Sequence, residues 1–418
     1  MDANIYKALC EEEKSGDLNE FIKDKTNEAR ERLGQENFMD DSMAMKCIIA
    51  TVFEDLSDSR FSDEEIDYAI RKIFYKTRRK LGILQPLAED SEISEIMVNG
   101  PRDIFVEKNG EIKKSEFCFD STEELEEVMR NIVGEVHREI NEKNPIVDAR
   151  LPDGSRVNGV YKNIAVNGPI LTIRKFSEKY LRMEDLIKNG TVSTNGAKVL
   201  TDFVYCGYNI FVSGGTSSGK TTLLNALAEA IPKDERVIVV EDSAELKMSY
   251  IENIVHMECR NSNSSGQGKV SMAELIKSSL RMRPNRIIVG EVRGGEVVDM
   301  LQAMNTGHNG SLSTGHANSV AGMLRRLETL YLTALPISVE AIRAQIAEGI
   351  DILVHIERTP GGKRKITEIT ELCGYENGKF GLNTLMKLNR EGELCFTGKK
   401  PYKTEKMEWK GVKYAGLQ

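Results

Sequence analysis

Residues 213–222 read SGGTSSGKTT, and this stretch constrains the fold more than any other part of the chain. The apolar run NIFV precedes it and the helix-forming run LLNALAEAI follows it. Gly214, Gly219, Lys220 and Thr221 satisfy the spacing G-x-x-x-x-G-K-[ST]. Glycine lets the backbone turn so that consecutive N–H groups can face a phosphate, and the helix that follows adds its N-terminus. The stretch therefore predicts a strand, a phosphate-binding loop and a helix in succession.

The same loop predicts roles for its polar groups. We expect Lys220 to reach the β- and γ-phosphates of ATP and the Thr221 hydroxyl to bind Mg²⁺. The residues expected to contact the nucleotide are Gly214, Gly215, Thr216, Ser217, Ser218, Gly219, Lys220, Thr221 and Thr222. ATP is thus the expected substrate and Mg²⁺ the expected cofactor.

After residue 207 the chain alternates apolar, β-rich runs with amphipathic helical runs. Strands are predicted at 209–213, 236–240, 254–258, 286–290, 310–314 and 350–356. Helices are predicted at 220–231, 271–282, 295–305, 319–331 and 338–348. Such alternation is typical of an α/β fold in which helices cover a parallel sheet.

The remaining sequence suggests three further regions. Residues 1–80 are charged and rich in helix formers, and predict a helical N-terminal extension. Residues 81–180 mix short β-rich runs with one amphipathic helix, and predict a small α+β domain. Residues 181–200 are polar and contain glycine, so we expect a linker there, followed by the α/β domain at 201–418.

Acidic residues and a histidine follow three of the predicted strands. Glu241 follows RVIVV, with Glu245 four residues later, Glu291 follows RIIVG, and His316 follows SLSTG. In a parallel sheet the carboxyl ends of the strands border the ligand crevice, so these side chains should reach the phosphates. Hydrolysis needs a metal ligand and a group that orients or deprotonates water, and these residues are the candidates. Alternatively, each acid could cap a helix or be solvated, and the histidine could be structural.

Composition argues against several classes of protein. The formal net charge is −8 with basic and acidic residues interleaved, which disfavours a dedicated nucleic-acid-binding protein. The seven cysteines form no CxxC pair, so neither zinc nor a disulfide framework is expected. We see no signal peptide and no apolar run long enough to span a membrane, and therefore expect a cytoplasmic protein with peripheral membrane association.

Several segments, taken in order, resemble those of the type II/IV secretion ATPases. GILQPLAEDSEISEIMVNGP (82–101) resembles the start of their N-terminal domain, and DARLPDGSRVNG (148–159) and LTIRKFS (171–177) resemble its arginine-bearing segments. VVEDSAEL (239–246) resembles their aspartate box. RMRPNRIIVGEVRGGEVVDMLQAMNTGHNGSLSTGHANS (281–319) resembles their variant Walker B and histidine boxes. The branch that the chain resembles most is that of the tight-adherence (Tad) pilus ATPases, often called CpaF.

The resemblance implies a RecA-like P-loop ATPase domain, with a mostly parallel sheet and helices on both faces, preceded by an α+β domain. It implies a homohexameric ring at the cytoplasmic face of the membrane, bound to polytopic inner-membrane platform proteins. ATP hydrolysis in the ring would power assembly of a Tad pilus or protein secretion, through closure of the N-terminal domain on the RecA-like domain.

The resemblance also implies individual roles. Glu291 becomes the Walker B acid and a Mg²⁺ ligand, in part through water. Glu245 becomes the general base, with Glu241 as its competitor, and His316 becomes the histidine-box residue. Three arginines become candidates to contact phosphate, some of them from a neighbouring subunit, because a guanidinium stays charged and binds phosphate through two N–H groups: Arg150, Arg156 and Arg174. Alternatively, these arginines form ion pairs at a domain interface.

Two positions depart from the family pattern. Ser217 stands where the family often has glycine, so it must avoid positive φ or accept a strain of about 1 kcal/mol. Gly315 stands where a β-branched residue usually precedes the histidine, and we expect it to loosen the strand end that holds His316.

Three alternative functions stay open. A type IV secretion ATPase that translocates DNA or protein would use the same chemistry. A nucleotide-binding scaffold would bind ATP without hydrolysing it, although the acidic residues argue against this. A nucleic-acid motor would use the basic C-terminal segment, although a solvated terminal segment or a strand pair is the favoured explanation of these residues: Lys399, Lys400, Lys403, Trp409 and Tyr414, with Lys406, Lys410 and Lys413.

Overall fold

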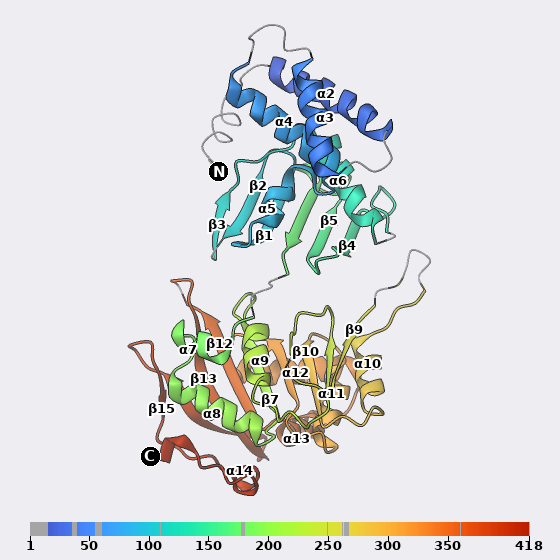
Figure 1. Cartoon of the computed structure of the whole chain (residues 1–418). Coiled ribbons are helices and arrows are strands. Elements are labelled where there is room, and N and C mark those ends of the chain that lie inside the picture. The colour runs from blue at the N-terminus through green and yellow to red at the C-terminus, as the bar shows by residue number, and fades with distance from the viewer. Residues whose placement is uncertain are drawn as a thin grey trace. The chain divides into compact units, whose positions relative to one another are not determined.

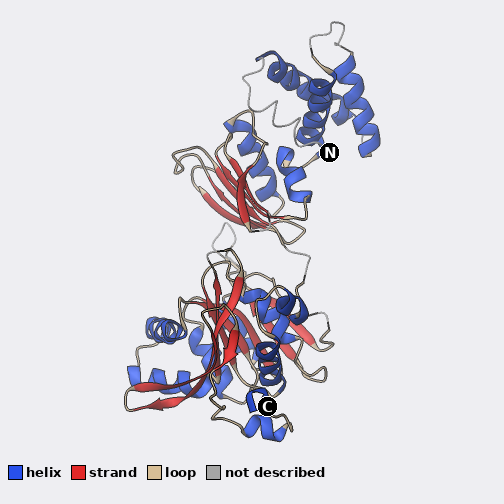
Figure 2. Ribbon diagram, turned by 90° about the vertical axis from the view of Figure 1, so that its left-hand side faces the viewer, coloured by secondary structure: helices blue, strands red, loops and turns tan. Residues whose placement is uncertain are grey.

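The computed structural model describes residues 16–35, 40–54, 61–108, 110–136, 138–176, 180–248, 250–260, 262, 267–359 and 361–417. The chain divides into two compact units, Met1–Glu178 and Lys179–Gln418. Figure 1 follows the elements of each unit along the chain, and Figure 2 separates helices from strands. Residues 1–15 of the expected helical extension, and Ser177 of an arginine-bearing segment, lie outside the described residues.

Three helices open the described part of the first unit: α2 (Gly16–Gln35), α3 (Asp41–Phe53) and α4 (Asp63–Arg78). They pack around a small apolar cluster in which Ile22, Ile48 and Ile73 are fully buried. A reciprocal capping box between Ser62 and Glu65 begins α4, because it satisfies N–H groups that have no partner inside the helix.

A six-stranded antiparallel sheet forms the rest of this unit, in the order β3-β2-β1-β6-β5-β4. Its strands are β1 (Ile93–Asn99), β2 (Ile104–Lys108), β3 (Glu111–Lys114), β4 (Ile146–Arg150), β5 (Arg156–Val160) and β6 (Ile170–Arg174). The accompanying helices are η1 (Gly82–Leu84), α5 (Gln85–Glu89) and α6 (Thr122–Gly134). Leu125 and Met129 of α6 share one core with Ile96 of β1 and Ile173 of β6. This core attaches the helix to one face of the sheet.

The second unit contains a nine-stranded mixed sheet in the order β15-β14-β13-β12-β7-β11-β10-β8-β9. The strands are β7 (Ile210–Gly214), β8 (Val237–Glu241), β9 (Ile254–Glu258), β10 (Arg286–Val292), β11 (Leu312–His316), β12 (Ile352–Arg358), β13 (Arg364–Glu376), β14 (Lys379–Leu388) and β15 (Leu394–Phe396). The pairs from β12 through β9 are parallel, and the pairs from β12 through β15 are antiparallel. The six strands expected from the sequence are present, whereas β13, β14 and β15 were not predicted.

Helices cover both faces of this sheet, and the alternation of side chains along β7 shows how. Ile210 and Val212 point into the core beneath α7, α8 and α9, whereas Phe211 points into the core beneath α10 to α13. The helices are α7 (Met183–Lys188), α8 (Thr194–Tyr205), α9 (Lys220–Ala228), α10 (Met272–Ser279), α11 (Val297–Asn305), α12 (Val320–Ala334), α13 (Val339–Gly349) and α14 (Glu405–Trp409), with η2 (Ala415–Leu417). A strand apolar on both faces is typical of the centre of a parallel sheet. The expected α/β fold is confirmed.

The range 181–200, where we expected a linker, needs a correction. It contains α7 and the first residues of α8, and its apolar residues Met183, Leu186 and Val192 are buried in the core of the second unit. Polar and glycine residues lie between these buried positions, so the average composition concealed an amphipathic pattern.

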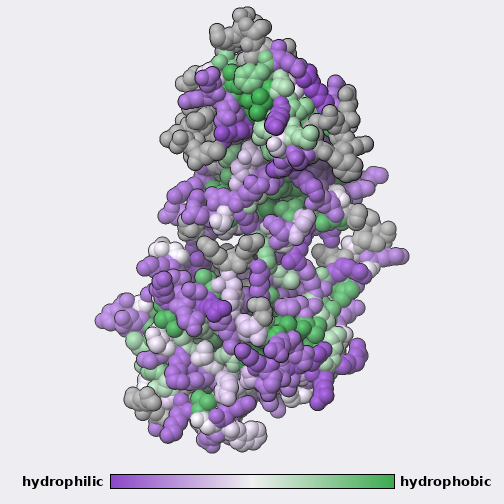
Figure 3. All heavy atoms as spheres, in the orientation of Figure 1, coloured by the Kyte–Doolittle hydropathy of each residue, from purple (hydrophilic) through white to green (hydrophobic). Residues whose placement is uncertain are grey.

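The surface drawn in Figure 3 is mostly hydrophilic, with small apolar patches between the charged side chains. Among the described residues, no helix combines the length and the apolar character needed to cross a bilayer.

Candidate active site

The phosphate-binding loop connects β7 to α9, as the motif predicts. Gly219 has a φ of 97° and begins α9, a conformation that glycine adopts at little cost. A Cβ on Gly214 would lie 2.3 Å from the carbonyl oxygen of Ile356, so only glycine fits there. Ser217 does adopt positive φ, 55°, and so accepts the strain that its side chain implied.

Lys220 is the buried cation of this loop, with 7% of its surface exposed. Its Nζ donates to the carbonyl oxygen of Gly215 at 2.9 Å and lies 3.4 Å from Nδ1 of His316. The Oγ of Ser218 is buried and has no hydrogen-bond partner among the described residues. The Lys220 ammonium group and the Ser218 hydroxyl could both donate hydrogen bonds to a polyanion such as the phosphate groups of a nucleotide.

Glu291 at the end of β10 lies next to His316 at the end of β11. Glu291 Oε1 is 2.6 Å from His316 Nε2, and Glu291 Oε2 accepts from Arg293 at 3.0 and 2.6 Å. Burial and the nearby Lys220 lower the pKa of His316, so its imidazole is neutral at pH 7. Lys220, His316 and Glu291 thus form a continuous line of polar groups across the carboxyl ends of three strands.

These residues also fit a magnesium ion bound with a nucleotide. Among the described residues, no group of three or more His, Cys, Asp or Glu side chains is arranged to hold a metal by itself. Mg²⁺ in nucleotide sites takes one or two protein oxygens together with phosphates. Glu291 Oε1 is held 2.6 Å from His316 Nε2 at the end of β10, and the half-buried Thr221 follows Lys220 directly. Both are the hard oxygen donors that Mg²⁺ prefers.

The structure separates the two acids of the aspartate box. Glu241 is only 4% exposed, and its Oε1 accepts from the backbone N–H groups of Glu245 at 2.9 Å and Leu246 at 3.1 Å. Glu241 therefore holds the turn that follows β8. Glu245 sits on that turn, half-buried, and stays the prediction for the general base.

The three candidate arginines lie in one row of the sheet of the first unit. Arg150 of β4 pairs with Arg156 of β5, which pairs with Arg174 of β6. Directly paired residues of an antiparallel sheet project from the same face, so the three guanidinium groups start from adjacent positions on one face. Arg150 also donates to the carbonyl oxygen of Gly154 at 3.1 Å. The two sequence segments thus supply one continuous cationic row.

Gly315 does not loosen the end of β11, contrary to expectation. Its Cα is buried, and a Cβ there would lie 3.0 Å from Met323 Cε and 3.0 Å from Phe211 Cε1. β11 is paired on both sides at this point, with Ser213 of β7 and Val292 of β10. Glycine therefore permits close packing beneath His316 and fixes that strand end.

Two arginines of the site were missed by sequence reasoning. Arg293 binds Glu291 and approaches Asp242, with 3.4 Å between Nη1 and Oδ2. The sequence did contain a signal for Arg293, because it lies two positions after Glu291, the expected metal-binding acid. Arg364, the first residue of β13, donates from Nε to the carbonyl oxygen of Ser217 at 3.2 Å. No local pattern marks Arg364, because only the pairing of β13 with β12 brings it to the loop.

Comparisons with known proteins agree with this geometry. The family model described as Type II/IV secretion system protein matches residues 77–359. The conjugal transfer protein TrbB of Rhizobium radiobacter is 34% identical over 311 residues, which cover 73% of this chain and 92% of TrbB. The type IV secretion system protein PtlH of Bordetella pertussis is 32% identical over 317 residues, which cover 69% of this chain and 93% of PtlH.

A solved structure shares the fold. The ATPase DotB of Legionella pneumophila aligns with a TM-score of 0.50 at 22% identity, over 71% of this chain and 80% of DotB. The family match covers both the arginine-bearing strands and the phosphate-binding loop. The chain belongs to the type II/IV secretion system family and is an ATPase.

Proposed function

We propose that this ATPase is a Mg²⁺-dependent motor that powers assembly of a Tad or type IV-like pilus, or protein secretion, across the cell envelope. The observation that carries the proposal is the presence of two complementary sites in separate units. One is a phosphate-binding loop that contains the buried Lys220 and a Ser218 hydroxyl with no hydrogen-bond partner among the described residues, and the other is a row of three arginines. A nucleotide bound by both would couple hydrolysis to domain movement.

Each residue at the loop has a defined task in this proposal. Lys220 and the loop N–H groups would bind the β- and γ-phosphates, and Thr221 and Glu291 would hold Mg²⁺, Glu291 in part through water. Mg²⁺ would neutralise charge that develops on the phosphate oxygens. Glu245 orients and deprotonates the attacking water, whereas Glu241 keeps the turn of Glu245 in place.

His316 couples the terminal phosphate to the strand ends. Its neutral imidazole lies between Lys220 and Glu291, so it can exchange a hydrogen bond as the charge of the γ-phosphate changes. A neutral ring has this advantage over a charged one, because it can both donate and accept.

Closure of the first unit on the second would be driven by charge. Arg150, Arg156 and Arg174 would bind the γ-phosphate while it is present and release it after hydrolysis, an electrostatic latch on a rigid-body movement. We propose a homohexameric ring in which some of these arginines act on a neighbouring subunit. The ring would lie in the cytoplasm, peripherally attached to polytopic inner-membrane platform proteins.

Substitution of the arginines tests the latch. We expect Arg150→Ala and Arg156→Ala to lower ATP turnover at least about tenfold, since arginines that contact a transferring phosphate have large effects on rate. Arg102→Ala is the matched control, because Arg102 is an exposed arginine of the same unit outside the row. Phosphate release would be measured together with circular dichroism to verify folding. Wild-type turnover in both row variants would contradict the latch but not the ATPase assignment.

A second candidate is a type IV secretion ATPase that translocates DNA or protein. The observation in its favour is that the relatives described above carry the names conjugal transfer protein and type IV secretion system protein. Deletion of the gene separates the two candidates. Loss of surface pili with normal conjugation would support the first, and loss of DNA transfer with normal pili would support the second.

A further inference from the structure

The β12–β13 hairpin forms one wall of the phosphate-binding loop. β12 pairs with β7 so that Ile356 lies opposite Gly214, the first glycine of the loop. The absence of a side chain on Gly214 lets the Ile356 carbonyl approach closely. Arg364 then begins β13 opposite Arg358, at the same level as the loop.

Arg364 contacts the phosphate-binding loop at the residues whose backbone has positive φ. Its Nε donates to the carbonyl oxygen of Ser217 at 3.2 Å, and its Cδ lies 3.4 Å from the position that a Cβ on Gly219 would occupy. Ser217 and Gly219 are the two loop residues with positive φ, 55° and 97°. Of these two loop residues, Ser217 has a Cβ and is therefore strained by positive φ, whereas Gly219 is not. Elsewhere among the described residues, Arg283 and Asn377 share this strained conformation.

A charged donor on the Ser217 carbonyl opposes relaxation of that residue. If Ser217 returned to negative φ, its peptide plane would turn and the carbonyl would leave the guanidinium. The loop N–H groups that bind phosphate depend on the same peptide orientations. The contact therefore favours the phosphate-binding conformation before any nucleotide arrives.

We propose that Arg364 is a positioning residue of the nucleotide site, which holds Ser217 in its left-handed conformation and so preorganises the phosphate-binding loop. The proposal rests on the ATPase assignment and is independent of what the motor transports. Preorganisation acts on binding, so Arg364 should affect nucleotide affinity and KM far more than kcat.

The test compares full-length variants by calorimetric titration with ADP and by steady-state ATP hydrolysis. Arg364→Ala should weaken ADP binding and raise KM for ATP about fivefold, with kcat within about twofold of wild type. Lys363→Ala is the matched control, because it removes a positive charge from the same hairpin without a side-chain contact to the loop. That variant should bind ADP with an affinity within about twofold of wild type.

A double-mutant cycle separates positioning from general attraction. Glycine adopts positive φ without strain, so a glycine at 217 does not need Arg364 to hold it in that conformation. Arg364→Ala should therefore weaken ADP binding much less in the Ser217→Gly background than in the wild-type background. Equal losses in both backgrounds would overturn the proposal, because they would mean that Arg364 acts on the nucleotide directly. Equal losses in Lys363→Ala and Arg364→Ala would also overturn it, since charge alone would then explain the effect. Thermal unfolding of each variant verifies that the fold is intact.

Discussion

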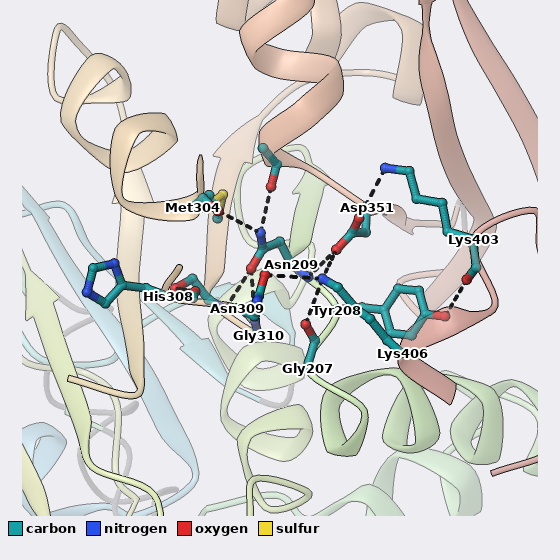
Figure 4. Close-up of polar contacts among 12 residues, drawn as sticks. Gly207, Tyr208, Asn209, Met304, His308, Asn309, Gly310, Asp351, Lys403 and Lys406 are labelled. Atoms are coloured by element: carbon teal, nitrogen blue, oxygen red, sulfur yellow. Dashed lines mark hydrogen bonds and ion pairs between the residues drawn. The ribbon is translucent and has the colours of Figure 1, made fainter. Parts of the chain in front are cut away.

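The two ends of the parallel sheet in the second unit differ in how completely their polar groups are satisfied. At the carboxyl end, the loop after β7 contains a strained Ser217, an unsatisfied Ser218 hydroxyl and a buried Lys220. At the amino end, the residue before β7 is Asn209, which is 2% exposed. Figure 4 shows that its polar atoms are all engaged in a local network.

Asn209 joins four segments of the chain. Its Oδ1 accepts from the N–H groups of Gly310 at 2.9 Å and Ser311 at 3.0 Å. Its Nδ2 donates to the carbonyl oxygens of Gly349 at 2.8 Å and Met304 at 3.3 Å. One buried amide therefore fixes the start of β7 against the last turns of α11 and α13 and against the segment that precedes β11.

Asp351 extends the network to the C-terminal segment. It accepts from the backbone N–H of Asn209 at 3.0 Å, and it pairs with Lys403 at 3.1 Å and Lys406 at 2.7 Å. Two of the C-terminal lysines considered for nucleic-acid binding thus have a structural role, and the aromatic Tyr414 is buried. Trp409 is 89% exposed and stays outside this network.

The difference shows where stability and function are placed in this unit. The side chains of Asn209 and Asp351 at the amino end are hydrogen-bonded or ion-paired within the protein, so they stabilise the fold whether or not a ligand is bound. At the carboxyl end, the Ser218 hydroxyl has no hydrogen-bond partner among the described residues and Ser217 is strained, and a preformed binding site commonly carries such costs. Substitutions at the two ends should therefore have opposite consequences for activity and stability.

The largest expected effect is on activity at the carboxyl end. Lys220→Ala should lower ATP turnover at least about 100-fold, because it removes the charged donor to the β- and γ-phosphates. Its free energy of unfolding without nucleotide should stay within about 1 kcal/mol of wild type, since a buried lysine cation is itself unfavourable. Phosphate release and urea unfolding measure the two quantities. Lys233→Ala, an exposed lysine of the same unit, is the control, and full turnover in Lys220→Ala would defeat the site assignment.

The converse effect is expected at the amino end. Asn209→Ala should lower the free energy of unfolding by about 3 kcal/mol, because it strands several buried backbone groups. KM for ATP should stay close to wild type at temperatures where the variant is folded. Asn309→Ala provides the matched control, since Asn309 is exposed and its side chain accepts a long hydrogen bond, 3.4 Å, from Lys406. If Asn209→Ala lost nucleotide affinity but not stability, the contrast between the two ends would be broken.

A smaller effect, on the pH dependence of stability, is expected at His355 in the middle of β12. His355 of β12 is 3% exposed and lies 2.8 Å from Ser213 Oγ. Burial lowers the pKa of His355, although Glu357 and Glu368 oppose that shift. In the unfolded chain, His355 is therefore protonated below about pH 6.5, whereas in the folded chain it stays neutral to lower pH. The free energy of unfolding thus decreases as the pH falls through about 6.5.

Replacement of His355 isolates this contribution. Between about pH 7.5 and pH 5.5, His355→Asn should lose about 1 kcal/mol less stability than wild type. Urea unfolding of both proteins at both pH values measures this difference. The other histidines are the same in the two proteins, so their contributions cancel when the two losses are compared. Parallel losses in wild type and variant would show that His355 titrates alike in both states.

Much of the fold and site could be predicted because local patterns carry them. The strands from β7 to β12 and the loop between β7 and α9 follow from alternating apolar runs and one glycine-rich motif. The positions of Glu291 and His316 follow from the rule that parallel strands end at one edge. The strands β13 to β15 were missed because their exposed and buried residues do not alternate regularly.

The remaining features depend on tertiary register, which the sequence does not display. The segments with Arg150, Arg156 and Arg174 were recognised, but their alignment in one row needs the pairing of three strands. Glu241 stayed a competitor of Glu245 for the role of general base, because only the fold of the turn decides which carboxylate caps backbone N–H groups. Gly315 looked like a weak point for the same reason, since the side chains that fill its space come from β7 and α12.

The contacts of Asp351 with Lys403 and Lys406 bear on the order of events during synthesis. A ribosome releases β7, the loop and Asp351 before these lysines, so the Asp351 carboxylate at the amino end of β12 lacks its two cationic partners until they are synthesised. The phosphate-binding loop and its β12–β13 wall can thus form first, while the ion pairs of Asp351 form only after residues 403–406 have emerged from the ribosome.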